Sequence, residues 1–451
     1  MYMIIKNLGP INNLKIQIRP YTIFFGDNGT GKTFTEYIIY SLFKYIRDYK
    51  AKVFIPENEI DLLLQRKEIL LDSNEVSDYL VKDISRSFNS NPKEFYDEIF
   101  ADKTVYIEGK TKIIVEEEDI RNLIIHENNI IWSFRSKMPD GTKIKFISRR
   151  KGENLATKIV IEEESINETD AIEDKSKQLS SLNEVINRNR EKLLEALMDL
   201  NYRLLFYRKN TNFLPAERIG INMFRKDLID RRAEVSFETQ GMPQSQLPTY
   251  PKPISDYLLF LNKSLVQLKP TEKKEKTKVN SYIKELIPGD FNYNSSLDSI
   301  MFSSDFGTVD FKLLSSSLKS LLGVDILLTS LKDKSNLKNV NDVIFIDEPE
   351  MNLHPKRQKL IADLLYTLSK TTSMTIVLST HSDYFIKATI NHLLREKKQG
   401  NYSVNNFAFY EFKDNTAKLF EDITDESNVE LKNFDDTTEN ILKEYYTLLG
   451  E

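Results

Sequence analysis

Three glycines, a lysine and two threonines fall within eight residues near the start of the chain, which fit the pattern GxxxxGKT. The loop consists of Gly26, Asp27, Asn28, Gly29, Thr30, Gly31, Lys32 and Thr33. An apolar run at 22–25 precedes it and an apolar-patterned segment at 34–46 follows, as expected for a strand and a helix. Such a loop turns its backbone N–H groups toward phosphates at a helix N-terminus. The pattern predicts that Lys32 reaches the β- and γ-phosphates of a nucleoside triphosphate and that Thr33 ligates Mg²⁺.

Two adjacent carboxylates close a second apolar run, far downstream of this loop. Residues 343–346 are apolar and largely β-branched, as in a buried parallel strand, and Asp347 and Glu348 follow directly. Ligands in open α/β sheets bind at the carboxyl ends of the strands. We therefore expect Asp347 to hold Mg²⁺, directly or through water, and Glu348 to orient or deprotonate an attacking water. The alternative is an acidic turn that only closes the strand.

A histidine follows a third apolar run. Residues 374–379 read as another buried strand, and His381, one of four histidines in the chain, comes just after it. A lone histidine is more often a satisfied polar residue than a catalytic one. At the same sheet edge as the loop and the acidic pair, however, His381 could hydrogen-bond a γ-phosphate.

These three elements, in this order, resemble the ATP-binding-cassette superfamily in its soluble SMC, RecF and OLD-like branch. Residues 4–11 and 26–29 look like the first hairpin and GxNGxGK loop of that branch. The run from 347 to 355 is similar to the DEPExxLHP signature of its prokaryotic AAA-like ATPases, and 213–218 resembles a PAER segment. The resemblance implies ATP and Mg²⁺ as cofactors and a homodimer, or higher oligomer, that sandwiches two ATPs.

The signature that caps the partner's ATP in this superfamily departs from its usual pattern here. The best candidate is Leu314-Ser315-Ser316-Ser317-Leu318, in which Ser315 would act on the partner's γ-phosphate. Glycines are missing at 316 and 317, where bare backbone normally approaches the phosphate. The plainer interpretation of the three serines is a helix N-cap. For the superfamily's Q-loop, Gln65 is a candidate by position only.

Composition predicts a soluble, cytoplasmic enzyme that does not span a membrane. The chain has 451 residues, no cysteine and a formal net charge of −5, and no apolar run approaches the roughly 20 residues of a membrane span. Nucleic-acid binding would therefore need a local basic patch. Candidates lie at 149–151 and 225–232, although charge runs are usually solvated faces.

The fold expected is α/β: a P-loop head with a mixed central sheet, an antiparallel lobe and a helical lobe, without a long coiled coil. Residues 1–50 and 201–451 are predicted to form the head and 51–200 an insertion. Within the insertion, the patterns predict helices over 54–100, antiparallel strands over 104–163 and a helix over 179–200. That last helix is too short for the long arms of chromosome-organising relatives.

Stand-alone heads of this kind resemble the ATPase subunits of prokaryotic anti-phage systems of the Septu and PARIS types. By that resemblance the chain is an ATP-hydrolysing switch that controls a separate nuclease effector of Toprim or HNH type. No nuclease site is predicted in the chain itself, since the 70 residues after His381 contain no DxD pair. The alternative is a RecF-like, DNA-binding ATPase of repair or recombination.

Overall fold

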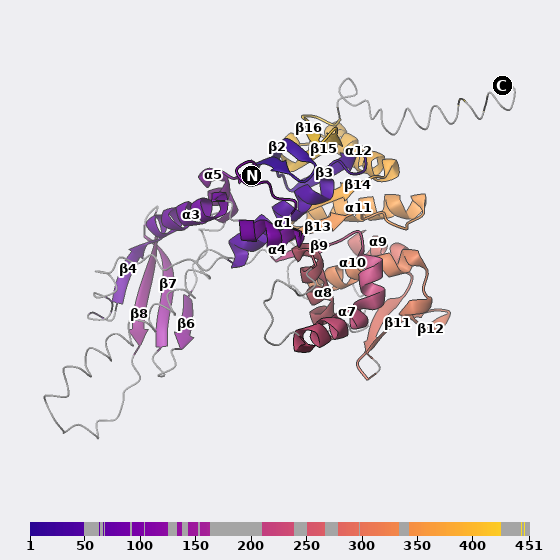
Figure 1. The fold of residues 1–451 in the computed structure, drawn as a ribbon, viewed down its shortest axis with the longest axis horizontal. Helices are drawn as coiled ribbons and strands as arrows, with labels where there is room; N and C mark the ends of the chain where they lie inside the picture. Colours follow the sequence, from indigo (N-terminus) through magenta and orange to yellow (C-terminus); the bar gives the residue numbers. More distant parts are fainter. Residues whose placement is uncertain are drawn as a thin grey trace. The chain divides into compact units, whose positions relative to one another are not determined.

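The computed structural model describes most of the chain. The described residues are 1–48, 63, 66, 68–90, 93–102, 104–124, 133–137, 143–151, 154–162, 210–238, 250–266, 278–296, 298–332, 342–424, 443 and 446. They form two compact units (Figure 1). One unit contains residues 2–43, 91–113 and 209–451, and the other contains Met1, 44–90 and 114–208.

A six-stranded sheet forms the centre of the first unit, in the order β16-β15-β3-β14-β13-β9 (Figure 1). Its strands are β3 (Tyr21–Gly26), β9 (Thr211–Leu214), β13 (Val343–Asp347), β14 (Thr375–Thr380), β15 (Phe407–Lys413) and β16 (Thr416–Phe420). All neighbours are parallel except the edge strand β16, which pairs antiparallel with β15. The expected mixed α/β sheet is confirmed. β3 and β13 are buried along their whole length, which explains why they are continuous apolar runs in the sequence.

Helices cover both faces of this sheet. Helix α1 (Lys32–Asp48) packs the rings of Tyr40 and Phe43 against Phe345 of β13. Ile344 and Ile346, which alternate with Phe345, join the main hydrophobic cluster on the opposite face. The helices that contribute to that cluster are α7 (Arg218–Glu238), α8 (Lys252–Leu265), α9 (Lys278–Leu286), α10 (Ser316–Lys332), α11 (Pro355–Thr371) and α12 (Asp383–Lys398).

Two small antiparallel sheets accompany the central one. The first has the order β2-β1-β5 and contains the N-terminal hairpin, β1 (Tyr2–Leu8) and β2 (Ile11–Gln17), with β5 (Lys112–Ile114). The second consists of β10 (Asp290–Asn294), β11 (Ser299–Ser304) and β12 (Gly307–Asp310). The short 3-10 helices η2 (Phe311–Leu313) and η4 (Val404–Asn406) precede α10 and β15.

Residues 91–113 belong to the unit that contains the central sheet. The sequence pattern predicts them as part of the insertion over 51–200. Helix α4 (Lys93–Phe100) ends in Phe100, whose ring stacks on Phe34 and Tyr37 of α1. Farther along, the Thr111 hydroxyl donates to the Asn7 carbonyl of the N-terminal hairpin. The sequence predicts antiparallel strands over 104–163, but between 104 and 116 only β5 forms, because most of this segment forms turns that pack against the hairpin.

The other unit carries the antiparallel lobe. Its sheet has the order β4-β8-β7-β6, with β4 (Glu68–Asp72), β6 (Ser133–Lys137), β7 (Lys143–Lys151) and β8 (Asn154–Glu162). Helices α3 (Ser73–Asn89) and α5 (Glu117–Ile124) complete it. The prediction of helix throughout 54–100 is wrong at β4, which pairs antiparallel with β8, so that sheet pairing overrides the helical pattern there. The helix expected over 179–200 lies outside the described residues.

None of the described helices combines the length and apolarity required to cross a bilayer.

Candidate functional site

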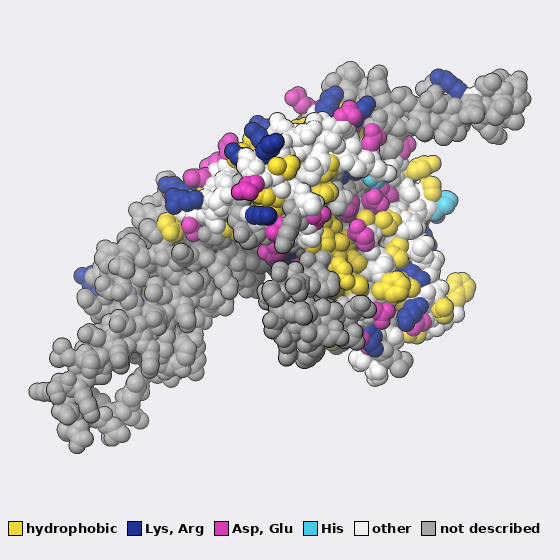
Figure 2. Space-filling model, viewed as in Figure 1, with side chains coloured by type: hydrophobic (Ala, Val, Ile, Leu, Met, Phe, Trp, Pro, Cys, Tyr) yellow, Lys and Arg dark blue, Asp and Glu magenta, His cyan; other side chains and the backbone are white. Residues whose placement is uncertain are grey.

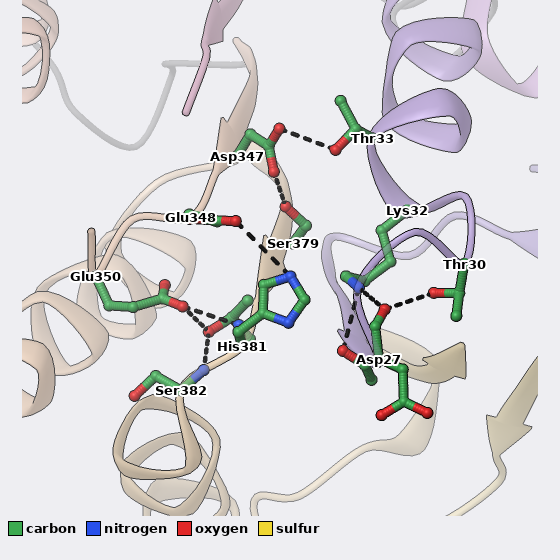
Figure 3. Close-up of polar contacts among 12 residues, drawn as sticks. Asp27, Thr30, Lys32, Thr33, Asp347, Glu348, Glu350, Ser379, His381 and Ser382 are labelled. Carbon is green, nitrogen blue, oxygen red and sulfur yellow. Dashed lines mark hydrogen bonds and ion pairs between the residues drawn. The ribbon is translucent and has the colours of Figure 1, made fainter. Parts of the chain in front are cut away.

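Three adjacent parallel strands bring the predicted site residues to one edge of the central sheet. β14 lies between β3 and β13, and all three strands run in the same direction. The glycine-rich loop leaves β3, His381 follows β14, and Glu348 follows β13. Their carboxyl ends therefore converge, as the sequence predicts (Figure 3).

The loop between β3 and α1 has a backbone that requires glycine. Gly26 has φ +122°, and a Cβ there would lie 2.2 Å from the Phe412 carbonyl oxygen of β15. Gly31 has φ +101°, and a Cβ there would lie 2.7 Å from Ile11 Cγ1. The Thr30 hydroxyl closes the turn by donating to the Asp27 carbonyl over 2.8 Å. The loop thus has a fixed shape, with Asn28 and Gly29 exposed at its tip.

Lys32 lies under this loop. It is only 5% exposed, and its Nζ donates to the carbonyls of Gly26, at 3.1 Å, and Asp27. Burial lowers the pKa of the ammonium group, and the Asp347 and Glu348 carboxylates oppose that shift. The ammonium is thus held by backbone carbonyls beside the loop that is shaped for phosphates.

Thr33 and Asp347 form the oxygen pair expected for Mg²⁺. The Thr33 hydroxyl donates to Asp347 Oδ2 over 3.1 Å, and the Ser379 hydroxyl of β14 donates to Oδ1. Hydroxyl and carboxylate oxygens suit this hard cation, which takes its remaining ligands from water and phosphate. The chemistry of the pair therefore fits Mg²⁺ delivered with a nucleotide. No larger group of acidic or histidine ligands that could hold a metal occurs among the described residues.

Glu348 follows Asp347 in an uncommon backbone conformation. Its φ is +50°, and its N–H donates to the Ser379 carbonyl over 3.1 Å. Its carboxylate Oε1 lies 3.7 Å from Nε2 of His381, and about a third of each side chain is exposed. Burial raises the pKa of Glu348, and the neighbouring charges of Asp347 and Glu350 add to the effect. Such a carboxylate is suited to accept a proton.

Glu350 fixes the position of His381, a role that the sequence did not single out. Its Oε1 accepts from the Thr380 hydroxyl at 2.7 Å and from the His381 N–H at 2.9 Å. The His381 ring lies between the Glu348 carboxylate and the Lys32 ammonium (Figure 3). Burial and the charge of Lys32 lower the pKa of the imidazole, which favours the neutral ring near neutral pH. A neutral imidazole can donate to a phosphate oxygen without needing a carboxylate partner.

Glu36 is a second residue that sequence reasoning missed. It lies on the first turns of α1 and is completely buried. Burial and the nearby Asp347 carboxylate raise its pKa well above the ordinary value, and an interaction with Ser379 offsets this only in part. A charged residue within the apolar-patterned segment 34–46 was the available signal.

Ser315 does not join this cluster within one chain. It lies exposed just before α10, and its hydroxyl accepts from the Leu318 N–H over 3.4 Å, in the manner of a helix N-cap. Ser317 accepts a hydrogen bond from Arg357 at 3.0 Å. No hydrogen bond connects Ser315 to the loop in the described part of the chain. Gln65 lies outside that part.

Among the basic residues considered for nucleic acid, Arg225 has a structural role instead. Arg225 is buried and pairs with Asp298 and Asn262, so it cannot reach a DNA phosphate. On the face shown in Figure 2, Lys and Arg side chains are interspersed with Asp and Glu.

Three solved structures are similar to this chain over most of its length at low identity. The SMC head domain from Thermotoga maritima is 12% identical, with 93% of this chain and 97% of that chain covered, at a TM-score of 0.30. An Smc head with an extended coiled coil bound to the C-terminal domain of ScpA, from Pyrococcus furiosus, is 10% identical with 98% of both chains covered, at 0.33. An SmcHead bound to the C-winged helix domain of ScpA is 12% identical with 93% and 96% covered, at 0.34. These scores describe a loose superposition.

The family to which the chain belongs follows from a match along the sequence. The matched span contains the glycine-rich loop, the Asp347–Glu348 pair and His381. Residues 1–386 match the family model described as the AAA ATPase domain, and this chain is a member of that family of P-loop ATPases.

Proposed function

We propose that this chain binds ATP with Mg²⁺ and hydrolyses the terminal phosphate, using the residues gathered at the carboxyl edge of β3, β14 and β13. The observation that carries the proposal is that the Glu348 carboxylate, the His381 ring and the Lys32 ammonium lie together beside the phosphate-shaped loop. Loop amides and Lys32 neutralise phosphate charge, and Thr33 and Asp347 hold Mg²⁺, which supplies further neutralisation of the β- and γ-phosphates.

Glu348 is the proposed general base. Its raised pKa and partly exposed carboxylate suit a group that aligns a water molecule and takes its proton. His381, held by Glu350 and neutral near pH 7, would donate a hydrogen bond to the γ-phosphate. Apart from the proton taken by Glu348, the residues of the site act by charge stabilisation and positioning, which is how most phosphoryl-transfer catalysis works.

Two copies of the chain would complete each active site. Ser315 is exposed at the N-terminus of a 17-residue helix, where the helix dipole favours an anion brought by another subunit. ATP binding would then join two heads and hydrolysis would release them. The chain would be a switch rather than a producer of ADP for its own sake.

By its resemblance to Septu- and PARIS-type ATPases, the switch would control a separate Toprim or HNH nuclease in prokaryotic anti-phage defence. That assignment rests on analogy between families, since a fold does not determine a function. The RecF-like alternative requires DNA to stimulate the ATPase. Purification from the native host, with mass spectrometry of co-eluting proteins, separates the two roles. A co-eluting nuclease supports the defence role, and DNA-stimulated hydrolysis without one supports repair.

The ATPase proposal is tested with Glu348→Gln. The variant should bind ATP as the wild type does, hydrolyse it roughly 100- to 10,000-fold more slowly, and accumulate as an ATP-dependent larger species. Adding Lys32→Ala should prevent that species from forming, because the nucleotide is no longer held. Unchanged hydrolysis by Glu348→Gln would show that Glu348 is not the base.

A further inference from the structure

Arg218 is a buried cation whose hydrogen bonds all go to backbone carbonyls. It begins helix α7 and is 1% exposed. Its Nη1 donates to the carbonyls of Asp347, at 2.9 Å, and Pro215, at 3.1 Å, and its Nη2 donates to that of Glu348 at 2.7 Å. Its Nε donates to the carbonyl of Ser320 at 3.0 Å. One guanidinium therefore joins the acidic turn, the β9–α7 turn and helix α10.

The charge of Arg218 is not matched by an ion pair among the described residues. Burying an unpaired cation is costly unless several hydrogen bonds compensate for lost water. A planar guanidinium with five donors can satisfy four carbonyls that point in different directions, and the single ammonium of a lysine cannot. The arrangement thus depends on arginine rather than on positive charge alone.

At one end, Arg218 holds the backbone of the proposed general base. Glu348 has φ +50°, a conformation that persists for a non-glycine residue only where its surroundings enforce it. Arg218 donates a hydrogen bond to the Glu348 carbonyl, and the Glu348 N–H donates to the Ser379 carbonyl. Together they set the direction in which the Glu348 carboxylate leaves the chain, toward His381 at 3.7 Å.

At the other end, Arg218 is tied to the helix that Ser315 caps. Ser320 lies on the second turn of α10, and one turn farther along α7 the Asn222 amide donates to the Lys319 carbonyl at 3.0 Å. Tyr257 in turn donates to Asn222 at 2.9 Å. Helices α7 and α10 are thus fastened twice, but only Arg218 also contacts the acidic turn.

We propose that Arg218 is a positioning residue that fixes the Glu348 backbone and couples it to the start of α10. A phosphate held at Ser315 by another subunit would then act on the alignment of Glu348 through one guanidinium. The inference rests on the proposed function, because it requires Glu348 to be the base. Coupling of this kind travels through hydrogen-bonded, rigid elements that two sites share.

Arg218→Lys tests the proposal, with Asn222→Ala as the matched control. Both positions lie buried on α7 and both bond to α10, but Asn222 makes no bond to the acidic turn. Arg218→Lys should lower kcat by about 10- to 100-fold, the loss expected from a small misplacement of a catalytic group, while KM and ATP affinity change less than about 3-fold. Asn222→Ala should lower Tm without a comparable loss of kcat.

Two results would overturn the proposal. One is that Arg218→Lys and Asn222→Ala have equal kcat when both are measured at temperatures equally far below their Tm, while Glu348→Gln still loses hydrolysis. The other comes from hydrogen exchange of the wild-type protein, which needs no folded variant. A nonhydrolysable ATP analogue should protect residues 316–324 and 347–353 together, and protection of one segment without the other contradicts coupling. If Glu348→Gln retains full activity, the proposed function itself has failed.

Discussion

The Thr33 hydroxyl donates to Asp347 Oδ2 across 3.1 Å, although 314 residues separate the two positions in the chain. Thr33 lies on the first turn of α1 and Asp347 ends β13, and strand β14 lies between β3 and β13 in the sheet. Ser379 of β14 binds the other oxygen of the same carboxylate. The carboxylate is therefore oriented from two elements before any ion arrives.

This contact predicts that the Thr33 hydroxyl helps Asp347 to bind Mg²⁺. Thr33→Val removes the hydroxyl but keeps the shape of the side chain, and Thr33→Ser keeps the hydroxyl. Thr33→Val should raise the Mg²⁺ concentration for half-maximal hydrolysis on the order of 10- to 100-fold, since a metal-supporting group is lost. A Mg²⁺ titration of the ATPase rate measures this.

Thr33→Ser should stay within about 3-fold of the wild type in the same titration, because Ser supplies an equivalent oxygen. If Thr33→Val needs no more Mg²⁺ than the wild type, or if Thr33→Ser needs as much as Thr33→Val, the hydroxyl does not support the ion and the assignment of Thr33 as a ligand is wrong.

Much of this site is predictable from local sequence because each part is a strand followed directly by its functional residue. β3 is largely apolar and β13 is apolar up to Asp347, so composition locates the ends of both strands, and the spacing of the glycine-rich loop locates Lys32. That the three strands are neighbours follows from the parallel topology that such runs favour.

The parts that escaped prediction depend on tertiary contacts. The sequence predicts that Arg218 follows a strand of the central sheet, but only the fold brings the carbonyls of Glu348 and Ser320 around it. Strand β4 has a short apolar core that suits helix or strand equally, and its pairing with β8 decides the outcome.

The loop glycines predict different effects for the same substitution. Gly26→Ala places a methyl group 2.2 Å from the Phe412 carbonyl oxygen at φ +122°, whereas at Gly29, with φ +73°, no atom lies within 4 Å of the added Cβ. Gly26→Ala should therefore lower Tm and abolish ATP binding, while Gly29→Ala should cost about 1–2 kcal/mol at most, for the left-handed backbone.

Thermal unfolding and binding of a fluorescent ATP analogue by both variants check this prediction. Equal Tm losses would mean that the Phe412 contact does not constrain Gly26.

Glu36 predicts a pH-dependent stability. Burial raises its pKa in the folded protein above the ordinary value of 4.5, so the folded state binds the proton more tightly than the unfolded state. The stability this contributes is complete below pH 4.5 and is lost as pH rises through the folded-state pKa. Glu36→Gln is neutral throughout and should gain Tm relative to the wild type as pH rises from 5 to 8.

The gain in Tm at pH 8 should be on the order of 2–4 °C for each kcal/mol by which the buried carboxylate destabilises the folded protein. Thermal unfolding without nucleotide measures it. The exposed Glu421→Gln is the control for the loss of one negative charge at the surface. A difference for Glu36→Gln that stays constant between pH 5 and 8 contradicts a raised pKa.

Substitutions of Ser315 show whether this residue only caps helix α10 or also acts on another subunit's ATP. Its hydroxyl accepts from the Leu318 N–H at 3.4 Å, and aspartate caps helices as well as serine does. Ser315→Asp therefore keeps the cap, and its charge suits the helix dipole, but it repels a γ-phosphate. If Ser315 only caps α10, Ser315→Asp hydrolyses ATP at the wild-type rate and Ser315→Ala loses about 1 kcal/mol of stability. We expect Ser315 to bind phosphate in trans. In that case Ser315→Asp keeps its Tm but loses ATP-dependent self-association and hydrolysis. Steady-state ATPase assays and size-exclusion chromatography separate the two outcomes.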